Sequence, residues 1–262
     1  MPAIRFDKYQ GAGNDFVMLD MTETPLELDV ATVERLCDRR FGIGADGLIA
    51  ICKSAKGDFK MRYYNSDGRE ASFCGNGSRC SVAFAFDKGI ITRQETLFEA
   101  YDGMHKGIIV KDDGDSKIVS MQMSDAQAEP YDGHILVDTG SPHYVTQVQD
   151  LDTLDVKALG AKIRYDKSIS ENGVNVDFIH FDGKTVHIRT YERGVEDETL
   201  ACGTGVTAAA IATAIWFGGE HFEVKARGGD LTVDFKRDGL IFSNIALTGP
   251  TCRVFGGEIT IL

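Results

Sequence analysis

The feature that most constrains the fold of this chain is a cysteine–glycine motif that occurs twice, each time at the start of a run of small and apolar residues. Cys74 opens the stretch CGNGSRC, and Cys202 opens CGTGVTAAAIATA about half the chain further on. Apolar runs that follow a Gly-rich turn and carry few charges predict helices that are buried on all sides. The two motifs therefore predict two buried helices, near residues 79–89 and 202–219.

Strand-like stretches surround both of these helices. In the first half, IRFDKYQGAGNDFVMLD indicates two strands around a Gly-rich turn, and residues 30–40 have the spacing of a helix with one apolar face. In the second half, a polar loop over residues 125–134 precedes the next strands. The remaining strands are expected near residues 48–52, 59–64, 97–123, 135–140, 175–183, 185–194, 221–229, 231–239, 240–249 and 252–262.

The two halves share one order of elements, namely strands, a Cys-Gly-x-Gly turn, a buried helix and more strands. This shared order predicts an α/β protein (of the α+β type) built from two related halves, which we place at residues 1–119 and 120–249. No proline-rich or low-complexity linker separates the halves, so we expect a substantial interface between them.

The composition excludes several classes of function. A formal net charge of −12 argues against binding to nucleic acid or to an anionic membrane, because both attract basic surfaces. The segment MPAIRFDKYQ has no apolar signal-peptide core, and no uncharged stretch is long enough for a membrane helix, so we expect a cytoplasmic protein. The six cysteines are then expected to be reduced, and without a CxxC pair or a His-rich tract no metal site is expected.

The start of a helix has special chemistry because its first backbone N–H groups have no partner within the helix. These groups and the helix dipole attract an anion such as a carboxylate, and they can stabilise a cysteine there as a reactive thiolate. Residues around both cysteines suit this use, because glycines let a ligand approach the backbone and polar side chains add donors. They are Gly75, Asn76, Gly77, Gly203, Thr204 and Gly205.

A single CGxG stretch before a helix is more often a packed turn than a reactive site. Two copies in equivalent halves favour chemistry, because two thiols that flank one carbon can remove a proton from one face and return it on the other. The helix ends would stabilise the charge that develops on an adjacent carboxylate. This hypothesis predicts an amino-acid racemase or epimerase that needs no cofactor, and the alternative is a non-catalytic anion-binding protein. The other cysteines, which we assign to packing, are Cys37, Cys52, Cys80 and Cys252.

Four stretches taken together resemble the diaminopimelate epimerase family. They are KYQGAGNDF at 8–16, YNSDGREASFCGNGSRC at 64–80, GVNVDFIH at 173–180 and YERGVEDETLACGTGVTAA at 191–209. The resemblance implies two pseudo-symmetric domains, each a mixed or antiparallel sheet around a central helix, with residues 250–262 returning to the first domain. It also implies a cofactor-independent homodimer that interconverts LL- and meso-2,6-diaminopimelate, in the synthesis of lysine and cell-wall precursors.

The resemblance also assigns roles to individual residues. Cys74 and Cys202 match the acid–base pair, and His143 and Glu192 match the positions that support the two thiols. Ser141 in the stretch GSPH replaces an Asn of the family, and Gly47 replaces a polar residue of some members, so the substrate contacts of both positions stay open. The positions that would hold the substrate are Asn14, Asn65, Gly75, Asn76, Asn175, Glu192, Arg193, Gly203 and Thr204.

Other interpretations of these residues remain open from the sequence. The three asparagines Asn14, Asn65 and Asn175 could serve only as turn residues. Arg193 could form a surface ion pair, and His143 could be structural. Among enzymes, proline racemases and hydroxyproline epimerases share the fold and the cysteine pair but resemble CGHG at the first cysteine, where this chain has CGNG. Phenazine-biosynthesis-like isomerases share the fold without the cysteine pair.

Overall fold

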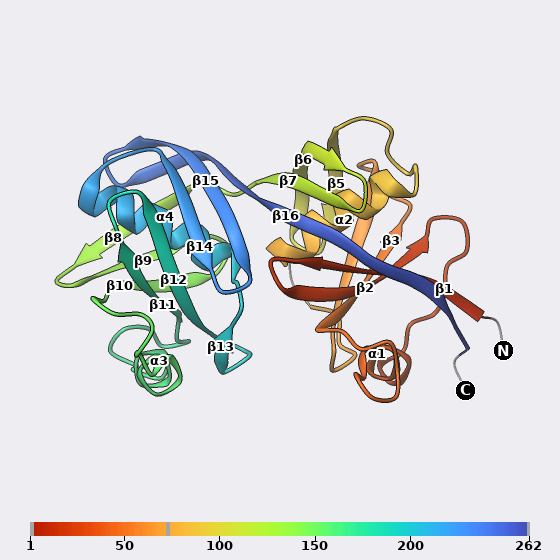
Figure 1. Cartoon of the computed structure of the whole chain (residues 1–262), viewed down its shortest axis with the longest axis horizontal. Helices are drawn as coiled ribbons and strands as arrows, with labels where there is room; N and C mark the ends of the chain where they lie inside the picture. The colour runs from red at the N-terminus through yellow and green to blue at the C-terminus, as the bar shows by residue number, and fades with distance from the viewer. Residues whose placement is uncertain (1–2, 72–73, 261–262) are drawn as a thin grey trace. The chain divides into compact units, whose positions relative to one another are not determined.

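The computed structural model describes residues 3–71 and 74–260 of the chain. The chain divides into two compact units. Unit 1 contains the residues up to Met121 together with the segment from Pro250 onward, and unit 2 contains Gln122–Gly249. In each unit, strands curve around one helix (Figure 1).

The strands of unit 1 form a sheet whose two edges are joined. Strands β1 to β7 lie next to each other in chain order, and the C-terminal part of β16 pairs with both β1 and β7. Pairing both edges removes the free strand edges through which sheets aggregate. These strands are β1 (Ala3–Gly11), β2 (Asn14–Met21), β3 (Gly47–Cys52), β4 (Phe59–Asn65), β5 (Glu95–Ala100), β6 (Gly103–Asp113), β7 (Ser116–Gln122) and β16 (Ile241–Thr260).

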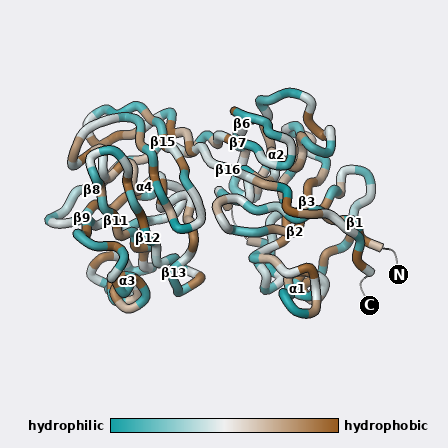
Figure 2. Tube along the Cα trace, viewed as in Figure 1, coloured by the Kyte–Doolittle hydropathy of each residue, from teal (hydrophilic) through white to brown (hydrophobic). Residues whose placement is uncertain are grey.

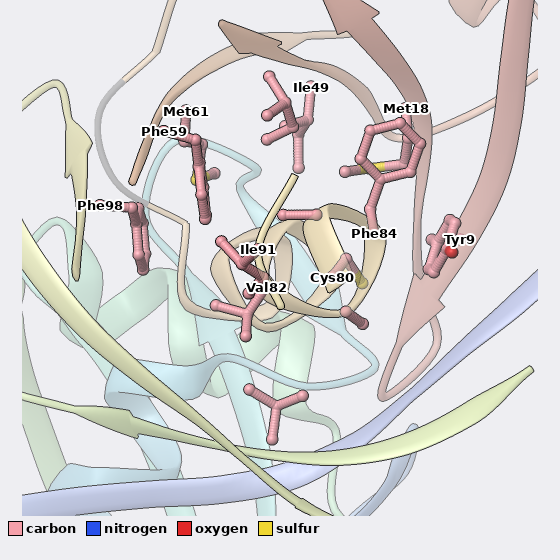
Figure 3. Close-up of a cluster of buried hydrophobic side chains, with 14 of the residues drawn as sticks. Tyr9, Met18, Ile49, Phe59, Met61, Cys80, Val82, Phe84, Ile91 and Phe98 are labelled. Carbon is pink, nitrogen blue, oxygen red and sulfur yellow. The ribbon is translucent and has the colours of Figure 1, made fainter. Parts of the chain in front are cut away.

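Alternation along the strands of unit 1 gives the sheet two apolar faces. In β2, Phe16 and Met18 point to one apolar cluster, whereas Val17 and Leu19 point to another. Helix α2 (Gly75–Asp87) lies in the first cluster, and Figure 3 shows strand side chains around it, among them Tyr9, Ile49 and Phe98. Helix α1 (Val30–Cys37) packs on the second cluster. The helix that carries Cys74 at its start is therefore surrounded by the sheet.

Unit 2 is built in the same way. Its sheet runs in the order β16-β15-β14-β12-β11-β10-β9-β8, and β8 pairs with β16 to join the edges. The mostly apolar helix α4 (Gly203–Phe217) is almost entirely buried, and α3 (Val156–Arg164) packs on β11 and β12 (Figure 2). The strands are β8 (Ala126–Tyr131), β9 (His134–Asp138), β10 (Pro142–Gln147), β11 (Asn175–Phe181), β12 (Thr185–Glu192), β13 (Asp197–Thr199), β14 (His221–Ala226) and β15 (Gly229–Asp238).

The two units repeat one order of crossover connections. In unit 1 the strand pairs β2–β3 and β4–β5 are parallel and are connected through α1 and α2. In unit 2 the parallel pairs are β10–β11 and β12–β14, connected through α3 and α4. In each unit the second crossover contains the helix that begins after a motif cysteine. The mixed α/β class expected from the sequence is confirmed.

Several details differ from the expectations. The polar loop expected over residues 125–134 is largely strand β8, which pairs with β9 across a turn at Asp132 and Gly133. Ala126 and Ala128 are buried while Gln127 and Glu129 are exposed, so the strand alternates although its composition is polar. The two strands expected at the C-terminus are one continuous strand, β16. Helix α3 was not expected at all.

The helix boundaries also differ in informative ways. The glycines of CGNG and CGTG form the first turns of α2 and α4 instead of a turn before each helix. Helix α1 ends at Cys37, earlier than expected, because the Asp38 side chain accepts hydrogen bonds from the backbone N–H groups of Arg40 and Phe41 and turns the chain. Across residues 3–71 and 74–260, no helix is long and apolar enough to cross a lipid bilayer.

Candidate active-site residues

Cys74 caps the N-terminus of α2. Its backbone is extended, and its Sγ atom accepts a hydrogen bond from the backbone N–H of Gly77 at 3.4 Å. Serine, threonine or aspartate usually makes this contact, and the positive end of the helix dipole favours negative charge at this position. A Cβ atom on Gly77 would lie 2.8 Å from Ile49 Cδ1, so glycine lets this first turn pack closely on β3. The half-buried thiol is therefore held at a helix end suited to a thiolate.

Asn14 directs its side-chain oxygen at this thiol. It begins β2 after the two-residue turn Ala12-Gly13, in which both residues have positive φ (51° and 83°), as a tight hairpin requires. The Asn14 Nδ2 group donates to Asp46 Oδ2 at 2.7 Å, which leaves Oδ1 3.7 Å from Cys74 Sγ. Asp46 is thus an orienting residue that the sequence reasoning missed.

The other expected positions of unit 1 lie near the same end of the sheet. Asn76, in the first turn of α2, is buried, and its Oδ1 accepts a hydrogen bond from Arg79 at 2.8 Å. Asn65 is exposed at the end of β4, opposite Gly47 of β3. A Cβ atom on Gly47 would lie 2.6 Å from both Tyr63 Cε2 and Tyr64 O, so this position has no room for a larger side chain.

Cys202 occupies the equivalent cap position of α4 in unit 2. Its backbone is also extended, and its Sγ atom lies 3.3 Å from the hydroxyl oxygen of Thr204. Burial raises the pKa of Cys202 well above its usual value, and the carboxylates of Glu192 and Asp177 act in the same direction. Cys202 is therefore held as a neutral thiol.

The Cys202 thiol is the end of a chain of hydrogen-bonding groups. Thr204 Oγ1 lies 2.8 Å from His143 Nε2, and His143 Nδ1 lies 2.7 Å from Asp177 Oδ2. A carboxylate only accepts hydrogen bonds, so Nδ1–H donates to Asp177 and Nε2 is the acceptor for the Thr204 hydroxyl. Thr204 Oγ1 can then accept from the Cys202 thiol. All four groups belong to unit 2 and are aligned for a proton to move from sulfur to imidazole.

Asp177 is the second residue that the sequence reasoning missed. It is fully buried, and its other oxygen accepts a hydrogen bond from Thr190 at 2.7 Å. Gly205 makes space for this cluster, because a Cβ atom there would lie 2.6 Å from Asp177 Oδ1. The signal in the sequence is a single acidic residue within the apolar run NVDFI, two residues after Asn175 and therefore on the same face of the strand.

Asn175 connects the remaining expected residues of unit 2. Its Nδ2 group donates to Ser141 Oγ at 2.9 Å, and its Oδ1 accepts from the backbone N–H of Arg193 at 2.8 Å. The Arg193 guanidinium donates to the backbone oxygen of Gly173 at 3.3 Å. The side chain of Asn175 thus fixes the loops before β10 and after β12, and the shorter Ser141 hydroxyl is used within the protein.

Glu192 ends β12, immediately before Arg193. Burial raises the pKa of Glu192, and the charge of Asp177 raises it further, whereas His143 lowers it. The structure thus brings together Asn14, Cys74, Gly75 and Asn76 in unit 1. In unit 2 it brings together Ser141, His143, Asn175, Arg193, Cys202, Gly203 and Thr204.

Comparison with known proteins identifies relatives over nearly the whole chain. A family model described as diaminopimelate epimerase matches residues 6–128 and 135–253. The chain is 46% identical over 259 residues to the diaminopimelate epimerase of Flavobacterium psychrophilum, covering 97% of this chain and 98% of that protein. For the diaminopimelate epimerase of Chlorobaculum tepidum the identity is 40%, covering 96% and 99%. For that of Methanocella arvoryzae it is 36%, covering 100% and 98%.

Solved structures share the fold at much lower identity. A PhzF-family phenazine biosynthesis protein from Bacillus anthracis superimposes with a TM-score of 0.78 at 17% identity, covering 100% of both chains. A hydroxyproline epimerase from Agrobacterium vitis, solved with bound trans-4-hydroxy-L-proline, gives a TM-score of 0.72 at 16% identity, covering 98% and 92%. These two likenesses concern the fold alone.

The raised pKa of Glu192 leads to a prediction about stability. A carboxyl whose pKa is raised in the folded state contributes stability that is present at low pH and is lost as the pH rises. We expect Glu192→Gln to raise the melting temperature relative to the parent chain, by a difference that grows from pH of about 4 to about 8. Thermal unfolding monitored by circular dichroism across this range measures the difference.

The matched control is Glu198→Gln in the same unit. Hydrogen bonds from Arg189 lower the pKa of Glu198, so its contribution to stability has the opposite pH dependence and disappears in acid. Glu198→Gln should therefore destabilise the chain most at neutral pH. A melting difference for Glu192→Gln that does not change with pH would contradict the assignment.

Proposed function

The chain belongs to the diaminopimelate epimerase family and is therefore an isomerase of lysine biosynthesis, and from this premise we propose how its residues act. Cys74 and Cys202 are the acid–base pair that interconverts LL- and meso-2,6-diaminopimelate. The observation that carries this proposal is that in each unit a cysteine caps the central buried helix. Both thiols thus stand at the start of a helix, where the orientation of the first backbone N–H groups and the helix dipole favour an anion.

The proposed reaction inverts one α-carbon. A thiolate removes the α-proton from one face, which leaves a carbanion whose charge spreads onto the adjacent carboxylate. The opposing thiol donates its proton to the other face, and it becomes the thiolate for the reverse reaction. The backbone N–H groups at the starts of α2 and α4, at Gly75-Asn76 and Gly203-Thr204, stabilise the charge on the carboxylate. The balance is one proton removed and one proton returned.

We further propose that His143 adjusts the protonation of Cys202 through Thr204. The Cys202 proton passes to Thr204 Oγ1 while the hydroxyl proton of Thr204 passes to His143 Nε2. The products are a thiolate on Cys202 and an imidazolium that Asp177 stabilises. This transfer would regenerate the thiolate form without opening the buried thiol to bulk water.

The remaining polar residues are proposed to hold the second amino-acid end of the substrate. Arg193 offers a guanidinium for a carboxylate, and Asn14, Asn65 and Asn175 offer amide groups near the two helix ends. Glu192 would accept hydrogen bonds from a substrate ammonium. These groups favour a substrate with two polar ends over proline. The proposal also includes catalysis without a cofactor and a cytoplasmic location.

The first prediction tests the function and the cysteine pair together. Reduced chain incubated with LL-diaminopimelate in heavy water should form the meso isomer with deuterium at the inverted α-carbon, and it should leave L-proline unchanged. Cys74→Ala and Cys202→Ala should each abolish epimerisation, since every turnover uses both groups. The corresponding serine variants should lose several orders of magnitude in kcat, because a hydroxyl is a far weaker acid than a thiol.

Chiral chromatography and mass spectrometry measure the isomers and the deuterium. Cys37→Ala, which removes a buried thiol at the last residue of α1, is the control and should keep turnover near the parental value. Either active-site alanine variant turning over at close to the parental rate would rule out the two-thiol mechanism. Racemisation of proline without action on diaminopimelate would instead assign the chain to the proline racemase type, and binding without any exchange would indicate an anion-binding protein.

The proposed transfer through Thr204 predicts a contrast between two substitutions. Thr204→Val keeps the shape but removes the hydroxyl that connects Cys202 to His143, and it should lower kcat about 10–100-fold, a typical cost for an orienting partner. Thr204→Ser keeps the hydroxyl and should retain most of the activity. Steady-state kinetics in both directions measures the effect, and equal rates for the two variants would show that the hydroxyl carries no proton.

We also propose that the chain forms a homodimer through a surface of unit 1 that combines exposed apolar and charged side chains. Val254 and Phe255 are exposed, and they line an open hollow of about 650 Å³ together with Ile43 and the charged residues Lys8, Asp15 and Arg39. A second copy that covers this surface would bury these side chains. Sedimentation velocity should show a dimer that Phe255→Glu dissociates and that Tyr131→Glu, an equally drastic change at an exposed residue of unit 2, leaves intact. A monomeric parent chain would contradict the proposal.

A further inference from the structure

Arg79 is the largest of the fully buried side chains in the described part of the chain. It belongs to α2 and follows Cys74 by five positions (79 − 74). Side chains of a helix lean toward its N-terminus, so the guanidinium reaches back to the first turn. There Nη2 donates to Asn76 Oδ1 at 2.8 Å, and Nη1 donates to Gly75 O at 3.4 Å. Both contacts are with the residues that follow the catalytic cysteine.

This buried cation is not paired with a carboxylate. Among residues 3–71 and 74–260, no Asp or Glu forms an ion pair with Arg79, and its Nε–H has no acceptor. Apart from Asp20, whose carboxylate accepts hydrogen bonds from Thr22, the charged groups on strands packed against α2 form ion pairs with other residues. These pairs are Asp7 with Lys88 and Arg253, Lys8 with Asp15, Lys60 with Glu99, Arg62 with Glu70, His105 with Asp102, and Lys106 with Glu95.

An unpaired buried guanidinium is costly, and its position increases the cost. Transfer of a cation from water to a protein interior is unfavourable unless an opposite charge compensates, and arginine does not lose its proton. The guanidinium also lies near the positive end of the α2 dipole, where a second positive charge is repelled. An anion at this helix end would offset both effects.

Two thiols are close enough to act on Arg79, and only one of them is suited to be that anion. Cys80 is fully buried, and burial raises its pKa, so it stays a neutral thiol. Cys74 is half-buried, caps the helix and accepts the Gly77 N–H. An ionised Cys74 would in turn favour the charged form of Arg79.

We propose that Arg79 is the buried counter-charge of the Cys74 thiolate and that it keeps this thiolate formed before substrate binds. Arg79 is thus a positioning residue, since it acts on Cys74 by its charge and on Asn76 by its hydrogen bond. The proposal deepens the function proposed above and rests on it in taking Cys74 as the base that is ready at rest. It also makes Cys74 the opposite of Cys202, because burial and then the carboxylates of Glu192 and Asp177 raise the pKa of Cys202 and keep it a thiol.

The test measures the ionisation of each cysteine without any substrate. The reduced full chain and its variants are alkylated with iodoacetamide across a range of pH, and mass mapping of peptides gives separate rates for Cys74 and Cys202. In Arg79→Met the pH profile of Cys74 alkylation should shift to higher pH by about one pKa unit. The alkylation rate at neutral pH should then be about tenfold lower than in the parent chain. The Cys202 profile should not change. Arg79→Lys, which keeps the charge, should shift the Cys74 profile less.

Lys117→Met is the matched control. Lys117 is also a buried cation beside α2, but it is paired with Asp87 at the far end of the helix and with Asp112. Its removal should change stability without moving the Cys74 profile. If Arg79→Met does not fold by circular dichroism, Arg79→Gln decides, because it removes the charge and keeps a donor for Asn76.

Two results would overturn the proposal. A folded neutral variant with the parental Cys74 profile would show that Arg79 does not stabilise the thiolate. A variant with the parental thiol profile but weaker binding of diaminopimelate would assign the charge to the substrate carboxylate instead. Since alkylation needs no turnover, the result is independent of whether the chain epimerises diaminopimelate.

Discussion

The structure depends on one constraint, which is that a helix placed inside a closed sheet cannot leave its first N–H groups to water. These groups carry partial positive charge, and leaving them buried without partners would cost stability. In unit 1 the Cys74 thiol accepts a hydrogen bond from the Gly77 N–H, whereas Cys202 of unit 2 occupies the N-cap position without such a side-chain bond, and both first turns contain glycines. A bound carboxylate would accept hydrogen bonds from N–H groups of the first turn that the cysteine does not engage. The arrangement that makes each fold possible therefore also gives each helix end the chemistry that we propose for binding an anion.

The two caps are alike in backbone geometry but differ in electrostatics. Around Cys202 the buried ionisable groups are acidic or are paired with acids, since Asp177 and Glu192 both oppose a negative charge on sulfur. Around Cys74 the buried group without a counter-charge is basic, namely Arg79. A helix end by itself would stabilise both thiolates equally. The differences between the two environments thus come from a few charged side chains inside otherwise similar cores.

The sequence predicted the parts of this fold that follow from local pattern. The paired motifs gave the two buried helices, and the Gly-rich turn before Asn14 gave the hairpin that orients it. Helix α3 was missed because Gly160 lowers the helix propensity of its segment. The glycine is required by packing, since a Cβ atom there would lie 2.4 Å from the Tyr191 side chain. Strand β8 was taken for a loop because polar and small residues mask its alternation.

The candidate site shows the same division between local and long-range information. Cysteines and glycines in a motif can be recognised in one stretch of sequence, whereas Asp177 and Arg79 acquire their roles from partners elsewhere or from the lack of them. An arginine within an apolar helix could equally have formed an ion pair with a neighbouring strand. What distinguishes Arg79 is that none of the carboxylates on the described strands forms an ion pair with it, which only the folded arrangement shows. A two-thiol epimerase needs one thiolate and one thiol at the start of each turnover. If both cysteines had identical environments, nothing would determine which of them is the thiolate. A buried positive charge near Cys74 and buried carboxylates near Cys202 provide a physical way to determine it.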